Sequence, residues 1–408
     1  MREILHCDMN NFYASVECRE HPEWKERPLA VCGKESDRHG IVLAKNYPAK
    51  AFGVKTGETI WQAKEKCPGL LCVEPHFEKY TEASRRAFAI YREYTDLVEP
   101  FGLDECWLDV TASRRLFGNG LNIANLLRER IKKELGLTIS CGISYNKVFA
   151  KLGSDLKKPD ACTLLLKENV PDTVFPLPVS MMLGVGPKTE RILTLYGIRT
   201  IGDLARADEI FLKNKFGKNG AWLKNAAAGN DAAPVLPDTA EPPMKSVSHG
   251  MTFPKDLTQP EEVWRAVLSL SQEIGRKLRF HQKAARGVSI VLKDNAFLYK
   301  SFQRRLPAPI SSTMPLARAA YELFEKEYCF RTPLRSVTVG AIDLESTKEG
   351  LQLSLFQAKD DLKGERIDRV MDSIRARWGK GAILQATLLQ NRAAEPEVPL
   401  PPAFSFPK

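Results

Sequence analysis

Apolar residues recur along the first 165 positions with two spacings, which predict an alternation of strands and helices. Short apolar runs predict strands at residues 4–10, 28–33, 40–44 and 138–144. Two longer segments, 78–98 and 122–135, have apolar residues at every third or fourth position and predict amphipathic helices. A basic segment, 146–158, predicts a further helix that ends before Pro159. The mixture predicts an α+β core with its helices on one face of a sheet.

The pattern changes after residue 165. Residues 182–204 combine turn glycines with the apolar spacing of a helix-hairpin-helix. Gly184 and Gly186 allow the backbone close to a phosphate, and the amides that open the following helix, which includes Lys188, can donate to it. A plain helical hairpin is the alternative.

A proline-rich segment, 231–245, has the composition of an extended tether. A further domain follows it. Helical spacing at 263–278 and near 316–328, together with strand-like runs at 287–292 and 337–344, predicts a second mixed unit of helices and strands.

Cations dominate one stretch of this second unit. Between residues 276 and 305 there are nine Lys or Arg and one acid, Asp294. A solvated face usually mixes charges of both signs, so phosphate binding is the better interpretation, with an affinity that falls as salt rises. The residues singled out as DNA contacts are Arg276, Lys277, Arg304 and Arg305.

Composition sets wider bounds. A chain of 408 residues that is 43% hydrophobic and 27% charged is expected to form several domains. Its net charge of +10 favours a polyanionic partner. Nine Cys without paired CxxC motifs predict reduced thiols in the cytoplasm and argue against a zinc site. No apolar run approaches membrane length, so no membrane partner is expected.

The most informative stretch is 101–109, an apolar strand or tight hairpin that contains Asp104 and Glu105. An Asp-Glu pair is usually a solvated turn, but bulky apolar neighbours mark this one as at least half-buried, and buried charges need partners. Asp8 interrupts a second apolar strand near the amino end. Three carboxylates on two strands would form a site for hard divalent cations.

Three further groups of residues are candidates for the site. Phe12 and Tyr13 could be core aromatics or site residues. Residues 45–55 interleave cations with Tyr47 and could hold a triphosphate. Lysines at positions 147, 151 and 158 could form either a solvated face or a phosphate clamp.

Four motifs in order along residues 1–165 resemble the catalytic core of the Y-family, translesion DNA polymerases of the DNA polymerase IV type. The motifs are Asp8-Met9; Asn46-Tyr47 with Phe52-Gly53-Val54; Asp104-Glu105 with Leu108-Asp109; and Gly142-Ile143-Ser144 with Asn146-Lys147, Ala150-Lys151, Ser154-Asp155 and Lys158-Pro159. The resemblance implies a right-hand polymerase. Its parts would be a palm at 1–10 and 76–165, fingers at 11–75, a helical thumb at 166–230, a linker at 231–245, an α/β little finger at 246–345 and a tail at 346–408.

By that resemblance, Asp8, Asp104 and Glu105, with the Met9 backbone carbonyl, hold two Mg²⁺ ions, for which Mn²⁺ can substitute. Tyr13 occupies the steric gate that excludes a ribose hydroxyl. The residues that contact the incoming deoxynucleoside triphosphate are Tyr13, Tyr47, Lys50 and Lys158. The implied reaction is two-metal-ion transfer of nucleotides to the 3′ end of primer-template DNA, across damaged template, with low fidelity and without proofreading.

Three positions depart from the family pattern. Gly102 stands where a Ser often precedes the second metal motif, Lys50 stands where Arg is usual, and Ala44 stands where many members have Thr. Because Lys is a point charge where Arg would form a bidentate fork, we expect retained activity with altered nucleotide affinity.

One motif lies in the tail. Gln352, Leu353, Leu355 and Phe356 resemble the motif that binds the bacterial sliding clamp, although an ordinary strand edge could have the same pattern. The chain is expected to be a monomer. A catalytically silent scaffold, a helix-hairpin-helix DNA-binding protein and a two-metal nuclease are the rival interpretations.

Overall fold

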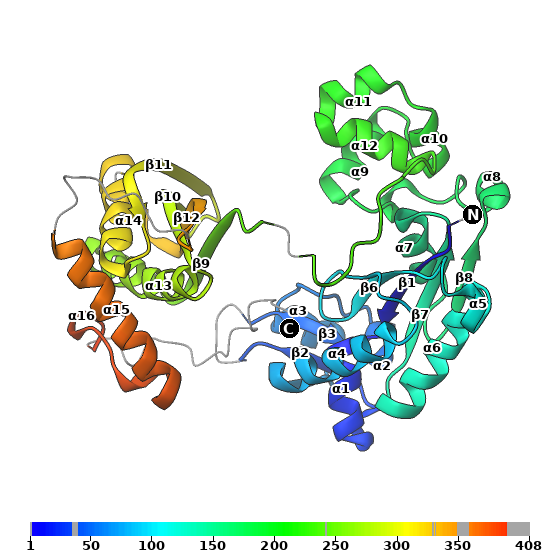
Figure 1. Ribbon diagram of the computed structural model, residues 1–408, viewed down its shortest axis with the longest axis horizontal. Coiled ribbons are helices and arrows are strands. Elements are labelled where there is room, and N and C mark those ends of the chain that lie inside the picture. The colour runs from blue at the N-terminus through cyan, green and yellow to red at the C-terminus, as the bar shows by residue number, and fades with distance from the viewer. Residues whose placement is uncertain are drawn as a thin grey trace. The chain divides into compact units, whose positions relative to one another are not determined.

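The computed structural model describes residues 2–34, 40–240, 243–328, 330, 332–348 and 359–389. The described residues divide into two units, one up to residue 240 and the other from residue 243 onward (Figure 1). The motifs at 8–9, 46–54, 104–109 and 142–159 all lie in the first unit. The tail motif at 352–356 lies outside the described residues.

The palm is a five-stranded sheet in the order β5-β6-β1-β7-β8. Its strands are β1 (Ile4–Met9), β5 (Val98–Pro100), β6 (Glu105–Asp109), β7 (Ile139–Ser144) and β8 (Cys162–Leu165). β1 is antiparallel to both β6 and β7, whereas β7 and β8 are parallel. Every residue of β1 and β7 is buried, so both faces of the sheet are covered at its centre.

Helices cover both faces of the palm, which corrects the expectation of helices on one face. Leu5 and Cys7 of β1 share a core with α4 (Phe77–Arg92) and α6 (Gly120–Leu135). On the opposite face α7 (Lys147–Leu156) packs against β7. A Cβ atom on Gly142 would lie 1.8 Å from a backbone oxygen of α7, so only glycine allows this close approach.

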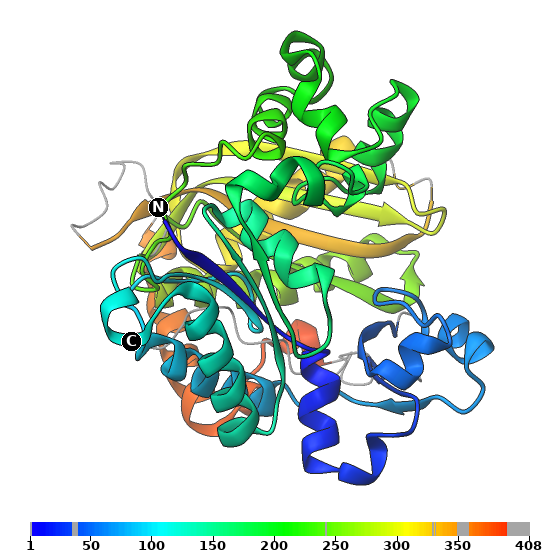
Figure 2. The same ribbon diagram turned by 90° about the vertical axis from the view of Figure 1, so that its right-hand side faces the viewer.

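The fingers are small. Their sheet, in the order β3-β2-β4, has three short strands, β2 (Leu29–Cys32), β3 (Val42–Lys45) and β4 (Leu71–Val73). The helices are α1 (Phe12–Glu20), α2 (Tyr47–Ala51) and α3 (Ile60–Lys66). β1 leads directly into α1, as Figure 2 shows. Asn46 caps α2 by accepting a hydrogen bond from the Ala49 amide at 3.1 Å.

The thumb is helical, as predicted. Its helices are α8 (Val170–Thr173), α9 (Pro187–Leu195), α10 (Ile201–Arg206), α11 (Glu209–Phe216) and α12 (Lys218–Ala227). The remaining short elements are α5 (Arg114–Phe117) and the 3-10 turns Pro22–Trp24, Lys167–Asn169, Val179–Met181 and Lys380–Ala382.

The segment predicted to be an extended tether is not free in its first half. The Leu236 amide donates to Glu99 at 2.8 Å, and Arg92 pairs with Asp238, so both bonds tie the segment to the palm. Val235 is buried among palm residues. The composition indicates the backbone preference of proline but not the contacts that an extended chain makes.

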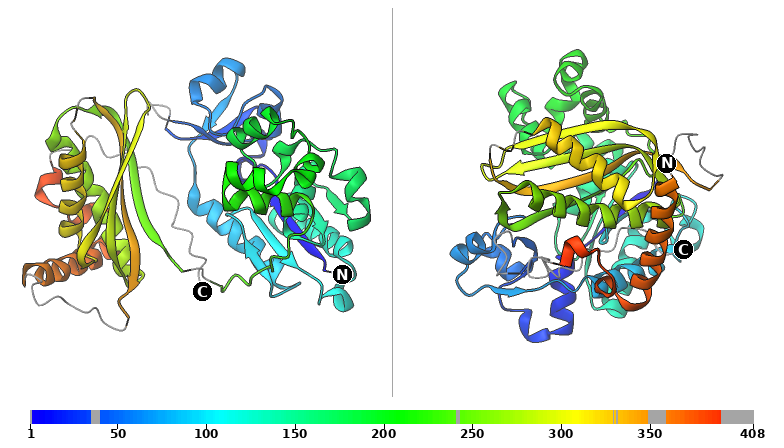
Figure 3. Two further views of the ribbon diagram at one scale, coloured as in Figure 1. Left: turned by 90° about the horizontal axis from the view of Figure 1, so that it is seen from above. Right: turned by 90° about the vertical axis from the view of Figure 1, so that its left-hand side faces the viewer.

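The second unit is a four-stranded sheet in the order β11-β10-β12-β9 with helices on one face (Figure 3). Its strands are β9 (Ser246–Leu257), β10 (Lys283–Asp294), β11 (Tyr299–Ile310) and β12 (Leu334–Ser346). Its helices are α13 (Pro260–Phe280), α14 (Thr313–Glu327), α15 (Lys359–Trp378) and α16 (Ala386–Leu389). α13 and α14 share one apolar core with the sheet.

Most predicted elements are present, but the helix expected at 78–98 ends early. α4 stops at Arg92, and Val98 instead begins β5. Val98 keeps the helical spacing of the preceding apolar residues because it belongs to the same core, not because the helix continues. None of the helices among the described residues has the length and apolar composition needed to span a bilayer.

Candidate active site

The pairing of β1 with β6 brings together the three predicted carboxylates. Asp8 and Glu105 are direct cross-strand partners. Asp104 lies one residue before β6, and its carbonyl accepts a hydrogen bond from the Met9 amide at 3.0 Å. Residues almost one hundred positions apart in the sequence therefore meet at the end of the palm strands.

The electrostatics of this cluster are those of crowded, poorly solvated anions. Burial raises the pKa of Asp8 to about 6, against the opposing influence of Lys158. Burial, with added repulsion from Asp8 and Glu105, raises the pKa of Asp104 to about 7. Like charges held this close favour the binding of a cation.

Two lysines neutralise part of the cluster, and a buried histidine lies beside it. Lys158 Nζ is 2.7 Å from Asp8 Oδ2, and Lys151 forms an ion pair with Glu105. His6 Nε2 lies 3.3 Å from Glu105 Oε2. Although burial opposes ionisation of Glu105, hydrogen bonds from His6 and Lys151 outweigh it and lower its pKa to about 2.

The donor set fits a hard divalent cation by its chemistry, because carboxylate oxygens are the ligands that Mg²⁺ and Mn²⁺ prefer. The side chains are not in a coordinating arrangement, since the described residues contain no group of three or more His, Cys, Asp or Glu side chains placed to hold a metal ion. Asp8 and Glu105 are instead paired with Lys158 and Lys151. Binding of cations would require these carboxylates to turn away from the lysines.

Part of this arrangement was not predicted from the sequence. His6 is fully buried and was not singled out. The alternatives for the lysines of α7 were a solvated face and a phosphate clamp, but Lys147 pairs with Glu99 and Lys151 pairs with Glu105. Their spacing of four residues places both on the side of α7 that faces the palm sheet, which was the available signal.

Tyr13 lies on the first turn of α1, the helix that follows β1. Its ring is half-buried and stacks on Tyr80 with centroids 4.3 Å apart. The ring of Phe77 meets it edge-on at 6.0 Å. Burial raises the pKa of Tyr13, and the charge of Asp104 adds to the effect.

Tyr47 and Lys50 lie on α2, the short helix that Asn46 caps. Lys50 is exposed and lies 5.8 Å from the centre of the Tyr47 ring. Burial raises the pKa of Tyr47, and the charges of Lys158 and Asp8 also act on it. Tyr47 therefore lies within electrostatic reach of Lys158 and Asp8.

Gly102 has a structural explanation. Its φ is +105°, a conformation that residues with a side chain rarely adopt, and a Cβ atom there would lie 3.5 Å from Asp104 Oδ1. In this chain the turn before Asp104 is thus built around glycine. Ala44, the third departure, pairs with Val31 in the fingers sheet and packs against the palm core.

The two thumb glycines, Gly184 and Gly186, differ in the space around them. Gly184 has a φ of +86°, and a Cβ atom on it would lie 2.9 Å from the Trp222 ring, so its role is explained by folding. Gly186 caps α9, and a Cβ atom there would meet no atom within 4 Å. Open space next to the amino end of α9, beside exposed Lys188, leaves room for a phosphate.

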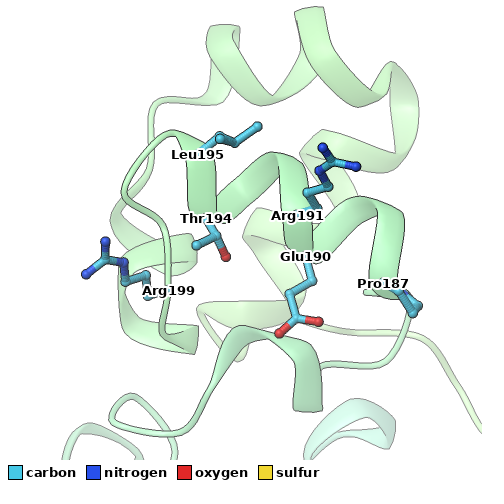
Figure 4. A pocket seen from close by; sticks show the side chains of 6 residues that line it. All are labelled: Pro187, Glu190, Arg191, Thr194, Leu195 and Arg199. Carbon is cyan, nitrogen blue, oxygen red and sulfur yellow. The ribbon is translucent and has the colours of Figure 1, made fainter.

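A hollow of about 560 Å³ lies beside α9 in the thumb. Figure 4 shows that its charged side chains, Glu190, Arg191 and Arg199, point away from one another. Without convergent polar groups this hollow offers no chemistry, and the carboxylate cluster remains the candidate site.

The four predicted DNA contacts of the second unit do not share a face. Arg276 and Lys277 lie on α13, and Arg276 pairs with Glu273 at 3.0 Å. Arg304 lies opposite Val288, on the side of the sheet that packs on the helices, and pairs with Glu322 of α14 at 2.6 Å. Arg305 lies opposite Gly287, on the other side. The apparent basic stripe is divided because alternate strand residues point to opposite faces.

Comparisons with known proteins identify the family of the chain. The impB/mucB/samB family matches residues 7–155, and its C-terminal domain matches residues 244–355. "DNA polymerase IV" from Acetivibrio thermocellus is 47% identical over 394 residues, which cover 96% of this chain and 98% of that protein. "DNA polymerase IV 1" from Bacillus subtilis is 38% identical over 395 residues, covering 97% and 95%.

Among solved structures, a "Y-family DNA polymerase chimera Dbh-Dpo4(243-245)-Dbh" has a TM-score of 0.73 at 22% identity, covering 84% of this chain and 99% of that one. The fold is therefore that of the Y-family DNA polymerases. The chain belongs to the impB/mucB/samB family, within the DNA polymerase IV type, and the resemblance inferred from its motifs is confirmed.

Proposed function

We propose that this chain adds deoxynucleotides to the 3′ end of a DNA primer by two-metal-ion transfer and copies damaged template with low fidelity. The observation that carries the proposal is the pairing of Asp8 with Glu105, which places both beside Asp104. The named relatives support the polymerase class. Metal use, fidelity and lesion bypass are the proposed refinements.

Asp8, Asp104 and Glu105, with the Met9 carbonyl, would hold two Mg²⁺ ions or Mn²⁺ in their place. When bound, such ions supply a lowered pKa for the primer hydroxyl and neutralise the triphosphate. The chain's own contribution is positioning, because transfer requires the hydroxyl and the α-phosphorus to be in line.

Lysine 158 would exchange partners during substrate binding. It now contacts Asp8 at 2.7 Å and Asp155 at 2.8 Å. When it is released from Asp8, its ammonium group would be available to the triphosphate, together with Tyr47 and Lys50. Tyr13 would lie against the sugar and exclude a 2′-hydroxyl by contact.

Low fidelity is supported by the size of the fingers. The described part of this domain consists of three short strands and short helices, so few side chains are available to press on the new base pair. Primer-template DNA would be held by the phosphate-accessible end of α9 in the thumb and by the helix-free face of the second unit.

We also propose that residues 352–356 bind the bacterial sliding clamp, which would raise local concentration on DNA without new catalytic contacts. Deleting these five residues should abolish stimulation by the clamp while unassisted extension continues. Equal loss of both would contradict the assignment. We further propose that the protein acts as a monomer in the cytoplasm.

Primer extension with wild type and Asp104→Asn, with and without Mg²⁺, on intact and lesion-bearing templates tests the main proposal. Wild type should lengthen the primer only with the metal, and Asp104→Asn should lose about 10²-fold or more of that rate. Shortening of the primer would indicate a nuclease. Binding without any change in length would indicate a DNA-binding scaffold or a helix-hairpin-helix binding protein.

A further inference from the structure

A row of four cysteines crosses the palm sheet. Cys106 on β6 lies opposite Cys7 on β1, Cys7 lies opposite Cys141 on β7, and Cys141 lies opposite Cys162 on β8. Direct cross-strand partners share a face, so all four thiols lie on one side of the sheet. That side is the one packed by α4 and α6, away from the carboxylate cluster.

The two central thiols of this row are close together, and the four differ in their exposure to solvent. Cys7 Sγ and Cys141 Sγ are 3.6 Å apart. Cys7, Cys106 and Cys141 are 0% exposed, whereas Cys162 is partly exposed because β8 is the edge strand. Arg128 Nη1 lies 4.0 Å from Cys162 Sγ. The row therefore has one solvent-facing end, beside a cation.

We propose that Cys162 and Cys141 are a modification site that forms a disulfide when the protein meets a hydroperoxide. Neighbouring strands lie about 4.8 Å apart. This spacing falls within the separation of roughly 4.4–6.8 Å between Cα atoms that a disulfide spans. Only side-chain rotation is then needed to join the two sulfurs. The inference does not depend on the polymerase function.

The chemistry takes place in two steps. The Cys162 sulfur attacks one oxygen of hydrogen peroxide, and the O–O bond breaks. The other oxygen leaves as water with the thiol proton, and Cys162 becomes a sulfenic acid. The Cys141 sulfur then attacks the Cys162 sulfur, the S–O bond breaks, and a second water leaves with the Cys141 proton. Two thiols lose two electrons and two protons, and one peroxide is reduced to two waters.

The surroundings of Cys162 also determine how fast its thiol reacts. The interaction with Cys141 and burial raise the pKa of the Cys162 thiol, so little thiolate is present at neutral pH. The reaction is therefore slow and responds to sustained peroxide. The competing explanation is that the four cysteines only fill the core as small apolar side chains, in which case no cross-link forms.

Peptide mapping of the folded full-length chain distinguishes these explanations. After treatment with hydrogen peroxide, free thiols are blocked with N-ethylmaleimide and the chain is digested without reduction. The expected product is a peptide pair joined through Cys141 and Cys162, lighter by two hydrogens and separated by dithiothreitol. Unmodified Cys162, or Cys162 oxidised without a link to Cys141, would overturn the proposal.

Three variants sharpen the result. Cys162→Ser should abolish the link, and Cys141→Ser should leave a Cys162 sulfenic acid that dimedone traps. Cys18→Ser is the matched control, since Cys18 is also partly exposed but lies on α1, outside the row, and the link should form at wild-type yield. The same yield of this link in urea-unfolded chain would show that the fold does not direct it and would also overturn the proposal.

Discussion

The ring of Tyr13 lies nearly parallel to the ring of Tyr80, with centroids 4.3 Å apart and planes inclined by 12°. Tyr80 is in turn held in place by a hydrogen bond on its far side. Its hydroxyl donates to the Glu17 carboxylate, which also contacts His76 Nδ1 at 2.9 Å. Tyr80 and Glu17 are completely buried. The position of the proposed sugar gate is therefore set by a buried tyrosine on α4.

Tyr80→Leu should weaken discrimination against ribonucleotides. Loss of an aromatic partner forfeits about 0.5–1.5 kcal/mol beyond area burial, which corresponds to roughly a two- to tenfold fall in selectivity if the Tyr13 ring loses its fixed position. The measurement is the ratio of kcat/KM for a deoxynucleotide to that for the matching ribonucleotide.

Phe88→Leu is the matched control for this change. Phe88 lies on the same helix and is equally buried, but its ring contacts Tyr91. Both variants should lower the melting temperature, and only Tyr80→Leu should change the sugar ratio. An equal change in both would show that general loosening of the core is responsible.

Adjacent arginines on β11 should differ in their effect on DNA binding. Arg305 faces the side of the sheet without helices, so Arg305→Ala should lower the slope of log affinity against log salt by about one. Arg304 points to the helix side and is paired with Glu322. Arg304→Ala should cost less than about 1 kcal/mol of stability and leave the slope unchanged.

Fluorescence anisotropy of a primer-template duplex at several salt concentrations measures both slopes. Lys277→Ala, on α13, provides a second control and should behave as Arg304→Ala does. If the slope falls equally in all three variants, DNA does not select one face of this unit.

The carboxylate cluster shows how much of a site can be predicted from sequence. Apolar runs interrupted by Asp8 and by Asp104 predicted two buried strands, and buried carboxylates imply a shared partner. The apolar pattern did not predict that Asp8 pairs directly with Glu105, because it does not determine which strands become neighbours or in what register.

Long-range register also explains what was missed. Whether Arg304 or Arg305 faces the helices depends on the register of β11 against β10, in which Val288 pairs with Arg304 and Gly287 pairs with Arg305, and the apolar pattern does not determine this register. The cysteines were judged to be scattered because they are far apart in sequence. Four of them nevertheless align, since strand order is a property of the folded sheet.

Substitutions of the two thumb glycines should separate an effect on folding from an effect on DNA binding. Gly184→Ala places a side chain at a φ of +86° and against Trp222, so it should destabilise the protein by about 1–3 kcal/mol. Gly186→Ala, with φ of −85° and open space, should change stability by less than about 0.5 kcal/mol. If phosphate approaches Gly186, this second variant should weaken DNA binding.

Thermal unfolding and anisotropy on the same samples measure the two effects. Loss of DNA affinity in Gly184→Ala alone, with Gly186→Ala unchanged, would place the phosphate elsewhere in the thumb. A stability loss in Gly186→Ala would contradict the open environment described for this residue.

One cation of the predicted basic stripe is better explained by folding. The Arg279 side chain is 8% exposed and contacts Asp372 at 2.7 Å and Asp368 at 3.1 Å, both on α15. Asp368 also accepts the Thr313 amide at 2.7 Å, at the start of α14. Arg279 thus joins three helices of the second unit.

Arg279→Ala should therefore release α15 and leave DNA binding intact. Removing one partner of a buried ion pair leaves an uncompensated charge and costs about 3–5 kcal/mol. Hydrogen exchange of the α15 amides should accelerate, whereas the salt slope for DNA should stay at its wild-type value. Arg276→Ala is the control, because that residue forms a more exposed pair with Glu273 and should leave exchange in α15 unchanged. A reduced salt slope without faster exchange would instead return Arg279 to the DNA-binding surface.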